Sequence, residues 1–235
     1  MPEALVWDQV GEHFYQTGLD RGVLFKYDTT LNAYGKGVAW NGLTSVEESP
    51  SGAEANAFYA DNIKYLNLTS AEEYAATIGA YTYPDEFESC NGYAEIAAGV
   101  QIGQQKRDMF AFAYRVKVGN DTEGDDHGYK IKIIYGCKAS PSSQSHSTIN
   151  DSPEPVEMSW EINTTPIQVP GFKPTATVDI DSTKCDSTKL KAFEKILYGS
   201  TEADSRLPLP DEIARLLGTV TTGGGSTPPS GGAQG

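Results

Sequence analysis

Hydrophobic residues alternate with other residues in two runs in the second half of the chain. Phe110, Phe112 and Tyr114 share one face of an extended segment, because successive side chains of a strand point to opposite faces. In the run 129–135 isoleucine alternates with lysine, and the loop 119–128, GNDTEGDDHG, joins the two runs. They predict a long antiparallel hairpin with one polar face, which makes the fold mainly β.

Shorter apolar runs bounded by turn residues predict further strands on both sides of this hairpin. A Pro-started acidic segment at 84–92, PDEFESCNG, predicts a single helical turn. The expected strands are a first hairpin of His13–Gln16 and Val23–Tyr27 around Thr17–Gly22, a strand Lys36–Glu47 that enters a long polar loop Glu48–Asn56, strands Ala57–Asn67 and Glu72–Tyr83, and a second pair of Val156–Ile162 with Thr175–Ile180.

The hydrophobic period changes from two to 3.6 near the C-terminus, which predicts helices. The final segment 219–235, TVTTGGGSTPPSGGAQG, is too rich in Gly, Ser and Pro to bury a core and predicts a flexible tail. We expect one mainly β domain over 1–218. The expected helices are one that Ser187 caps, that Gly199 ends and that aligns Leu190, Phe193, Ile196 and Leu197, and a shorter one over Pro210–Leu217.

The chain carries a formal charge of −14 from 32 acidic and 18 basic residues, which argues against nucleic-acid binding through clustered cations. The three cysteines, Cys90, Cys137 and Cys185, form no CxxC motif or Cys/His cluster, so neither a zinc site nor a disulfide framework is indicated. No basic segment followed by an apolar stretch opens the sequence, and no apolar run approaches the ~18 residues of a membrane span. These features predict a soluble protein that is made and kept in the cytoplasm.

The inventory of catalytic groups is small. The three histidines, His13, His127 and His146, stand apart from any nucleophile motif, and no GxSxG, P-loop, HExxH or GxGxxG pattern occurs. The acidic loop Asp121–His127 departs from the EF-hand spacing of calcium sites and is better interpreted as a solvated hairpin tip. We therefore expect no enzyme activity, no metal and no cofactor.

Four stretches of this sequence, in order along the chain, resemble the major tail proteins of long-tailed, non-contractile bacteriophages (siphophages). The resemblance covers nearly everything before residue 219. Its segments are 40–92, WNGLTSVEESPSGAEANAFYADNIKYLNLTSAEEYAATIGAYTYPDEFESCNG; 99–136, GVQIGQQKRDMFAFAYRVKVGNDTEGDDHGYKIKIIYG; 150–167, NDSPEPVEMSWEINTTPI; and 197–213, LYGSTEADSRLPLPDEI.

This resemblance implies a β-sandwich or open barrel of the tail-tube type with one flanking α-helix. Six subunits, each lending four strands, would assemble into a closed β-barrel ring, and stacked rings would form the tube that conducts viral double-stranded DNA without binding it specifically. Other tail proteins, such as the tape measure and the tail terminator, would be partners, and no membrane is involved. The protein would be synthesised in the host bacterial cytoplasm and reside in the tail of the virion.

Two regions are candidates for contacts within such a tube. The polar loop after the strand 36–47 can reach a neighbouring ring, or it can be a mobile surface loop. The hairpin from Met109 to Tyr135 is a candidate for the inner wall or a subunit contact. The surplus of acidic residues suggests an acidic bore that repels DNA, and the lysines of this hairpin fit such a bore less well. The ring-stacking candidates are Glu47, Glu48, Ser49, Ser51, Glu54 and Asn56, and the hairpin candidates are Asp121, Glu123, Asp125, Asp126, Lys130 and Lys132.

Two other kinds of protein share the predicted strand content and acidity. One is a monomeric β-sandwich that binds carbohydrate or protein. The other is the tube protein of a contractile secretion device. A binding module would stay monomeric at high concentration, whereas a tube subunit should convert to rings or filaments.

Overall fold

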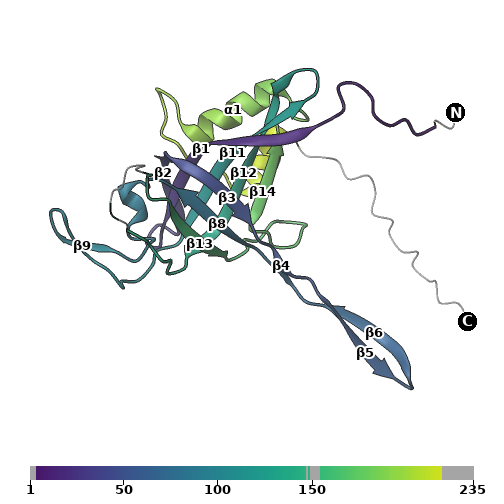
Figure 1. The fold of residues 1–235 in the computed structure, drawn as a ribbon, viewed down its shortest axis with the longest axis horizontal. Coiled ribbons are helices and arrows are strands. Elements are labelled where there is room, and N and C mark those ends of the chain that lie inside the picture. The colour runs from purple at the N-terminus through teal and green to yellow at the C-terminus, as the bar shows by residue number, and fades with distance from the viewer. Residues whose placement is uncertain (1–3, 147, 149–153, 219–235) are drawn as a thin grey trace, which may run out of the picture.

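The computed structural model describes residues 4–146, 148 and 154–218, and this part of the chain is mainly β with a large antiparallel sheet (Figure 1). In chain order the elements are β1 (Tyr15–Asp28), β2 (Ala33–Trp40), β3 (Leu43–Glu48), β4 (Ser51–Gly52), β5 (Ala55–Ala60), β6 (Ile63–Thr69), β7 (Glu72–Glu73), β8 (Ala75–Ala80), the 3₁₀ turn η1 (Asp85–Phe87), β9 (Ala94–Ala97), β10 (Val100–Ile102), β11 (Phe110–Asn120), β12 (Gly124–Ala139), β13 (Met158–Thr164), β14 (Thr177–Asp181), α1 (Ser187–Tyr198) and α2 (Pro210–Leu217).

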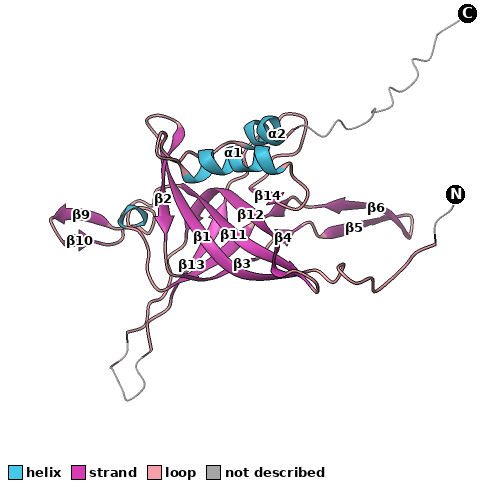
Figure 2. Ribbon diagram, turned by 90° about the horizontal axis from the view of Figure 1, so that it is seen from above, coloured by secondary structure: helices cyan, strands magenta, loops and turns pink. Residues whose placement is uncertain are grey.

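The eight-stranded sheet runs in the order β2-β1-β11-β12-β13-β8-β3, and β14 pairs with β12 beside β13. The long strand β12 therefore has two partners along one edge: β14 beside its middle, at residues 130–134, and β13 beside its end. At the far edge the Leu43 side chain of β3 lies against Gly22 of β1, where a Cβ atom would collide with it. The sheet thus curls until its two ends approach each other, as Figure 2 shows from above.

Two hydrophobic cores lie on the two faces of this sheet. Inside the curl, Trp40, Phe87 and Trp160 pack ring against ring with centroids 4.6 to 5.6 Å apart, together with aromatic side chains of β11. On the outer face α1 and α2 bury Phe193, Ile213 and their neighbours against alanine and isoleucine side chains of β11 and β12 (Figure 2). Aromatic side chains bury large apolar areas, so these rings contribute much of the stability of the two cores.

The predicted first hairpin is wrong, because residues 15–28 form the single strand β1. Thr17–Gly22 contains Gly18 and Arg21, both with positive φ, which favours a turn. In the structure these residues instead lie at two irregularities of the pairing with β11, between Thr17 and Leu19 and between Asp20 and Val23. Bulges accommodate such backbone without reversing the strand.

The predicted polar loop Glu48–Asn56 is also wrong. The strand expected over Lys36–Glu47 breaks at Asn41 and Gly42, where Gly42 has a φ of 75°, and the residues after Glu48 form β4 and the start of β5. The strand expected over Ala57–Asn67 is in fact the hairpin β5–β6, because Asp61 and Asn62 form its turn. Of the expected strand Glu72–Tyr83 only residues 75–80 join the main sheet, as β8, while Glu72–Glu73 form β7.

The long hairpin is confirmed as β11–β12, but its predicted polar face is wrong for half of its length. Around Phe112 and Ile134 both faces are buried, one inside the curl and one beneath the helices. Only the end that carries Lys130 and Lys132 keeps a polar face. The segments expected as a second pair do not pair with each other as strands: β13 pairs with β8 and β12, and β14 pairs with β12.

The single turn at 84–92 is confirmed as η1, and both helices are confirmed. The N-cap of α1 is Asp186, whose carboxylate accepts hydrogen bonds from the backbone of Thr188 and Lys189, and not the predicted Ser187. Ile196 is only partly buried, whereas the other three residues of its predicted face are buried. The tail expected over 219–235 lies outside the described residues.

Candidate assembly surfaces

The hairpin β5–β6 stands away from the body of the molecule as an arm, which we define as residues 49–73 (Figure 1). Asp61 and Asn62 have φ values of 50° and 59°, as the two central residues of a type I′ turn require. Cross-strand partners share a face, so the register brings Ala60 with Ile63, Phe58 with Leu66, and Asn56 with Leu68 onto one face. The members of this apolar ladder are Phe58, Ile63, Leu66 and Leu68.

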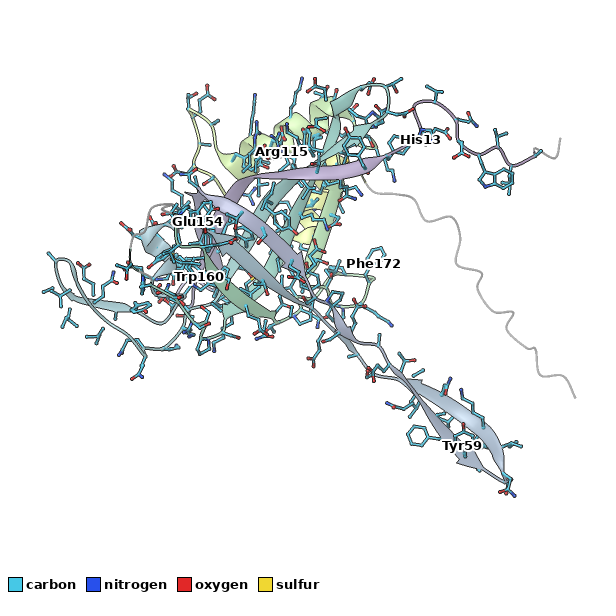
Figure 3. The ribbon with its side chains drawn as sticks, in the orientation of Figure 1. His13, Tyr59, Arg115, Glu154, Trp160 and Phe172 are labelled. Atoms are coloured by element: carbon cyan, nitrogen blue, oxygen red, sulfur yellow. The ribbon has the colours of Figure 1, made fainter. Side chains whose placement is uncertain are left out.

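Nothing in the described chain covers the apolar ladder. Its side chains are exposed by 51% at Phe58, 62% at Ile63, 38% at Leu66 and 57% at Leu68. Tyr59, which is also exposed, projects from the arm far from the body in Figure 3. A two-stranded hairpin is at best marginally stable alone in water, and contiguous exposed apolar patches mark interaction sites. The arm is therefore suited to be completed by another molecule.

A polar cluster fixes the root of the arm to the sheet. The Glu48 carboxylate accepts a hydrogen bond of 2.6 Å from the Tyr114 hydroxyl and one of 2.5 Å from the Lys132 ammonium. Lys132 also lies 3.3 Å from Asp179. Burial opposes ionisation of Glu48, but these hydrogen bonds outweigh it and hold the pKa of Glu48 below its ordinary value.

The predicted stacking residues lie along the root and first strand of the arm. Glu47 is exposed at the end of β3, Ser51 lies in β4, and Asn56 lies in β5 at the body end of the apolar face. Ser49 donates its backbone N–H to Ala75, and the Glu54 carbonyl accepts from Ser70, which ties the two sides of the root together. Of the predicted set, Glu48 is the residue whose carboxylate turns inward to Tyr114 and Lys132.

Replacing Glu48 with glutamine should lower the free energy of unfolding by about 1 kcal/mol at pH 7, since the site is partly exposed and solvent screens the lost attraction. A carboxylate whose pKa is lowered by folding stabilises the folded state at every pH above the pKa that it has in the unfolded chain. This stabilisation disappears as the pH falls through the lower pKa that it has in the folded protein. Urea unfolding should therefore separate the variant from the unsubstituted protein at pH 7, and the difference should shrink as the pH falls below the ordinary pKa of a glutamate and through the lowered pKa of Glu48. The neighbouring exposed Glu47→Gln variant is the control, and an equal loss there would contradict the assignment.

One part of the sheet has two unpaired edges. Beside residues 130–134 of β12 the strands run β1-β11-β12-β14, each antiparallel to the next. Residues 15–20 of β1 pair only with β11, and β14 pairs only with β12, within the described residues. Tyr135 donates to the Ala176 carbonyl and Ser182 to that of Tyr129, so by alternation the N–H of Asp179 points to the open edge.

The face of this four-stranded section that lies opposite the helices is partly buried and carries charges of both signs. In register, Lys130 lies opposite Asp181 and Lys132 opposite Asp179, and they share a face with Val116. Opposite charges on adjacent strands stabilise the pair and cancel its field. Lys132 forms ion pairs with Glu48 and Asp179, and Lys130 lies opposite Asp181 in the register; the sequence pattern did not place these carboxylates beside the lysines.

The tip of β11–β12 holds the N-terminal segment. Asp121 accepts hydrogen bonds from the backbone of Gly11, at 3.0 Å, and of His13, and the backbone donors together with the His13 ring lower the pKa of Asp121 to about 2. The other predicted tip residues are also engaged or exposed: Glu123 lies 2.6 Å from the His127 ring, Asp125 accepts from the Tyr15 hydroxyl, and Asp126 is exposed. The segment so held presents Leu5, Trp7 and Val10 to solvent, and Figure 3 shows His13 on it.

A second hairpin, β9–β10, stands at the end of the molecule opposite the arm, as both ribbon views show (Figures 1 and 2). Its Ile96, Val100 and Ile102 side chains are exposed. Beside its root is a groove of about 650 Å³ lined mainly by polar residues, among them Asn91, Gln105 and Arg107. The two ends of the molecule therefore carry different exposed apolar surfaces.

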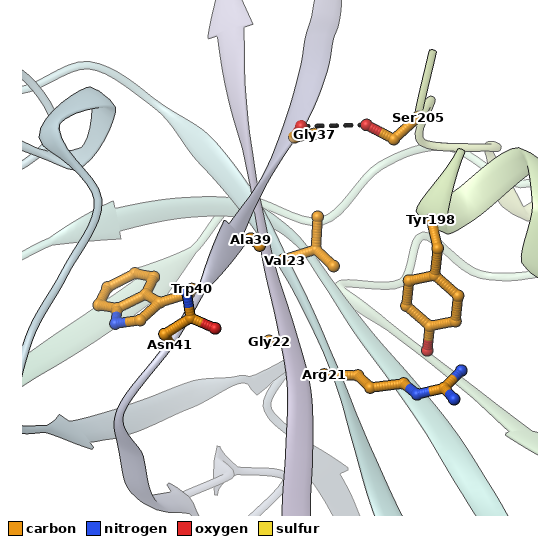
Figure 4. A pocket seen from close by; sticks show the side chains of 9 residues that line it. All are labelled: Arg21, Gly22, Val23, Gly37, Ala39, Trp40, Asn41, Tyr198 and Ser205. Atoms are coloured by element: carbon orange, nitrogen blue, oxygen red, sulfur yellow. Dashed lines mark hydrogen bonds between the residues drawn. The ribbon is translucent and has the colours of Figure 1, made fainter. Parts of the chain in front are cut away.

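The hollow in Figure 4, between β1, β2 and the end of α1, contains no convergent catalytic groups. Arg21 lies over the Tyr198 ring at 5.4 Å, and the Ser205 hydroxyl donates to the Gly37 carbonyl at 3.0 Å. Among the described residues no group of three or more His, Cys, Asp or Glu side chains is placed to hold a metal ion. Nor does a described helix have the length and apolar character needed to cross a membrane.

No protein-family model matches the chain, and a search of curated proteins finds no match either. The surfaces described above therefore carry the functional argument.

Sequence reasoning missed the residues that define these surfaces most clearly. The apolar ladder is not found from the sequence, because Ala57–Asn67 is treated there as one strand. Asp61–Asn62 between alternating apolar residues is a hairpin signal that could have divided this strand. The carboxylates of Asp179 and Asp181 could not be placed beside the lysines, because the partner of β14 depends on the curl of the whole sheet.

Proposed function

We propose that this chain is a structural subunit of a bacteriophage tail tube, in which rings of six copies stack into a hollow conduit for the viral genome. The observation that carries the proposal is the uncovered apolar ladder of the arm, which needs a partner molecule to be buried. The two open edges of the four-stranded section support it as well. The resemblance of the sequence to siphophage tail proteins supplies the ring size.

Strand direction permits ring closure. Along β1-β11-β12-β14 the directions alternate, so β14 of one copy meets β1 of a neighbour related by rotation in the antiparallel sense. Four strands from each of six copies then close a barrel without an open edge, which removes the aggregation hazard of unpaired strands. The helices cover one face of this section and would lie outside the barrel.

Such a barrel has room for DNA. About 24 strands spaced ~4.8 Å apart and tilted by ~40° give a backbone diameter of about 48 Å. Side chains of ~5 Å on each side leave a bore of about 38 Å, wide enough for a duplex of about 20 Å. The face with Lys130 and Lys132 opposite Asp181 and Asp179 would line the bore. Lys132 is paired with two carboxylates and Lys130 lies opposite Asp181, so the positive charge that phosphates would meet there is reduced.

Electron microscopy of the concentrated full chain tests the proposal. Rings or tubes with a central bore of about 38 Å are expected, and assembled tubes should retain no duplex DNA at physiological salt. A protein that stays a single globule at every concentration and salt condition would instead indicate a monomeric binding module. A tube that traps DNA would contradict the neutral inner wall while leaving the tube itself in place.

A further inference from the structure

The arm and the β9–β10 hairpin lie at opposite ends of the long dimension of the molecule (Figures 1 and 2). We propose that the β9–β10 end, with its polar groove, receives the arm tip of a second copy, so that subunits join head to tail. This inference rests on the proposed function and names the surface onto which the arm docks. Charge, exposed apolar surface and the length of the arm all favour this contact.

Arg107 lines the groove, and Lys106 precedes it in the chain. The Nη1 atom of Arg107 donates to the Asn91 side chain at 3.2 Å and to the carbonyls of Ala139 and Ser140 at 3.3 and 3.4 Å, which fixes the guanidinium in place. Its remaining nitrogens have no hydrogen-bond partner among the described residues. Lys106, next to it, is exposed and has no ion pair in the same part of the chain. The site therefore offers one fixed cation, Arg107, and one exposed lysine next to it in the chain.

The tip of the arm carries the opposite charge. Asp61 is exposed at the turn, and its carboxylate has no ion-pair partner in the described chain. Behind it on the arm, Phe58 and Ile63 are the outer members of the apolar ladder, while the receiving end exposes Ile96, Val100 and Ile102. A carboxylate directed at Lys106 and Arg107 would set the register of this apolar contact, because charge pairs select orientation more than they add affinity.

The length and direction of the arm require the contact to be between two molecules. From Glu48 to Asp61 the arm extends for about 40 Å at ~3.3 Å per residue, comparable to the diameter of a domain of this size. It points away from its own β9–β10 end, so it cannot fill that groove itself. A contact between two different surfaces of the same chain is heterologous and propagates along one direction. It would link successive rings.

Swapping the charges of the two proposed partners, Asp61 and Lys106, tests the inference with the full chain. Asp61→Lys and Lys106→Asp should each raise the concentration needed for assembly by about tenfold, and the double variant should return to within about threefold of the unsubstituted protein. Both positions are exposed, so circular dichroism and thermal unfolding should be unchanged. The assembly concentration of the unsubstituted protein should rise with salt.

The outcomes separate the two levels of the argument. Tubes that form equally well with either single substitution would overturn the docking site and leave the proposed tube standing. Single substitutions that weaken assembly without recovery in the double variant would show that the two residues do not face each other, and would also overturn it. Failure of the unsubstituted chain to assemble at all would overturn both.

Discussion

Replacing Phe58 and Leu66 with serine should raise the protein concentration at which tubes form by about a thousandfold. Each side chain loses roughly 2 kcal/mol of burial in the contact, and about 4 kcal/mol corresponds to a factor near a thousand. The two residues face each other across the arm on its apolar side. Sedimentation velocity over a range of concentrations measures the shift.

The same substitution should leave the body of the subunit intact, because the ladder covers nothing in its own chain. The midpoint of thermal unfolding is expected to stay within about 2 °C. A matched control is Ala57→Ser with Asn67→Ser, a cross-strand pair on the opposite face of the arm. Equal loss of assembly in both variants, or none in either, would show that the apolar face is not the contact.

Replacing Asp179 with proline should abolish ring closure while the subunit remains folded. The N–H of residue 179 points to the open edge of β14, so proline removes a donor that only a neighbouring copy would use. Proline is tolerated at such edge positions. Electron microscopy should show the loss of rings, and circular dichroism should show an unchanged strand content.

The control for this variant is Asp179→Ser, which also removes the carboxylate near Lys132 but keeps the backbone donor. It should still form rings. Rings in the proline variant would show that β14 does not pair with a neighbour through this edge, and unfolding of the proline variant alone would show that its N–H serves the subunit itself.

Local patterns predicted the elements whose partners are close in sequence. The hairpin β11–β12 followed from alternation, and α2 followed from Pro210 and Gly218 at its ends. The first strand was misjudged because Gly18 and Arg21 adopt positive φ inside a strand, where tertiary pairing with β11 converts a turn signal into bulges.

Long-range pairing could not be predicted in this way. The second half of β12 appeared to have a polar face, because the sequence does not show that the sheet curls and buries Ile134 beside Trp160. The partner of β14 was missed for the same reason. In the candidate site, the acidic residues around Glu48 were found, but the Tyr114 and Lys132 partners that fix its orientation come from strands far away in the chain.

The central claim is that the open strand edges and the arm of this subunit are completed only by its neighbours. Hydrogen exchange of the dispersed and the assembled protein, followed by mass spectrometry, tests it most directly. In the dispersed subunit, rapid exchange is expected for the amides of residues 15–20 and 177–181 that face the open edges and for the amides of the arm at 55–69. These amides should become protected by at least tenfold on assembly, while those of the buried centre of β11 stay protected in both states. Equal exchange of these three segments in the two states would contradict the account.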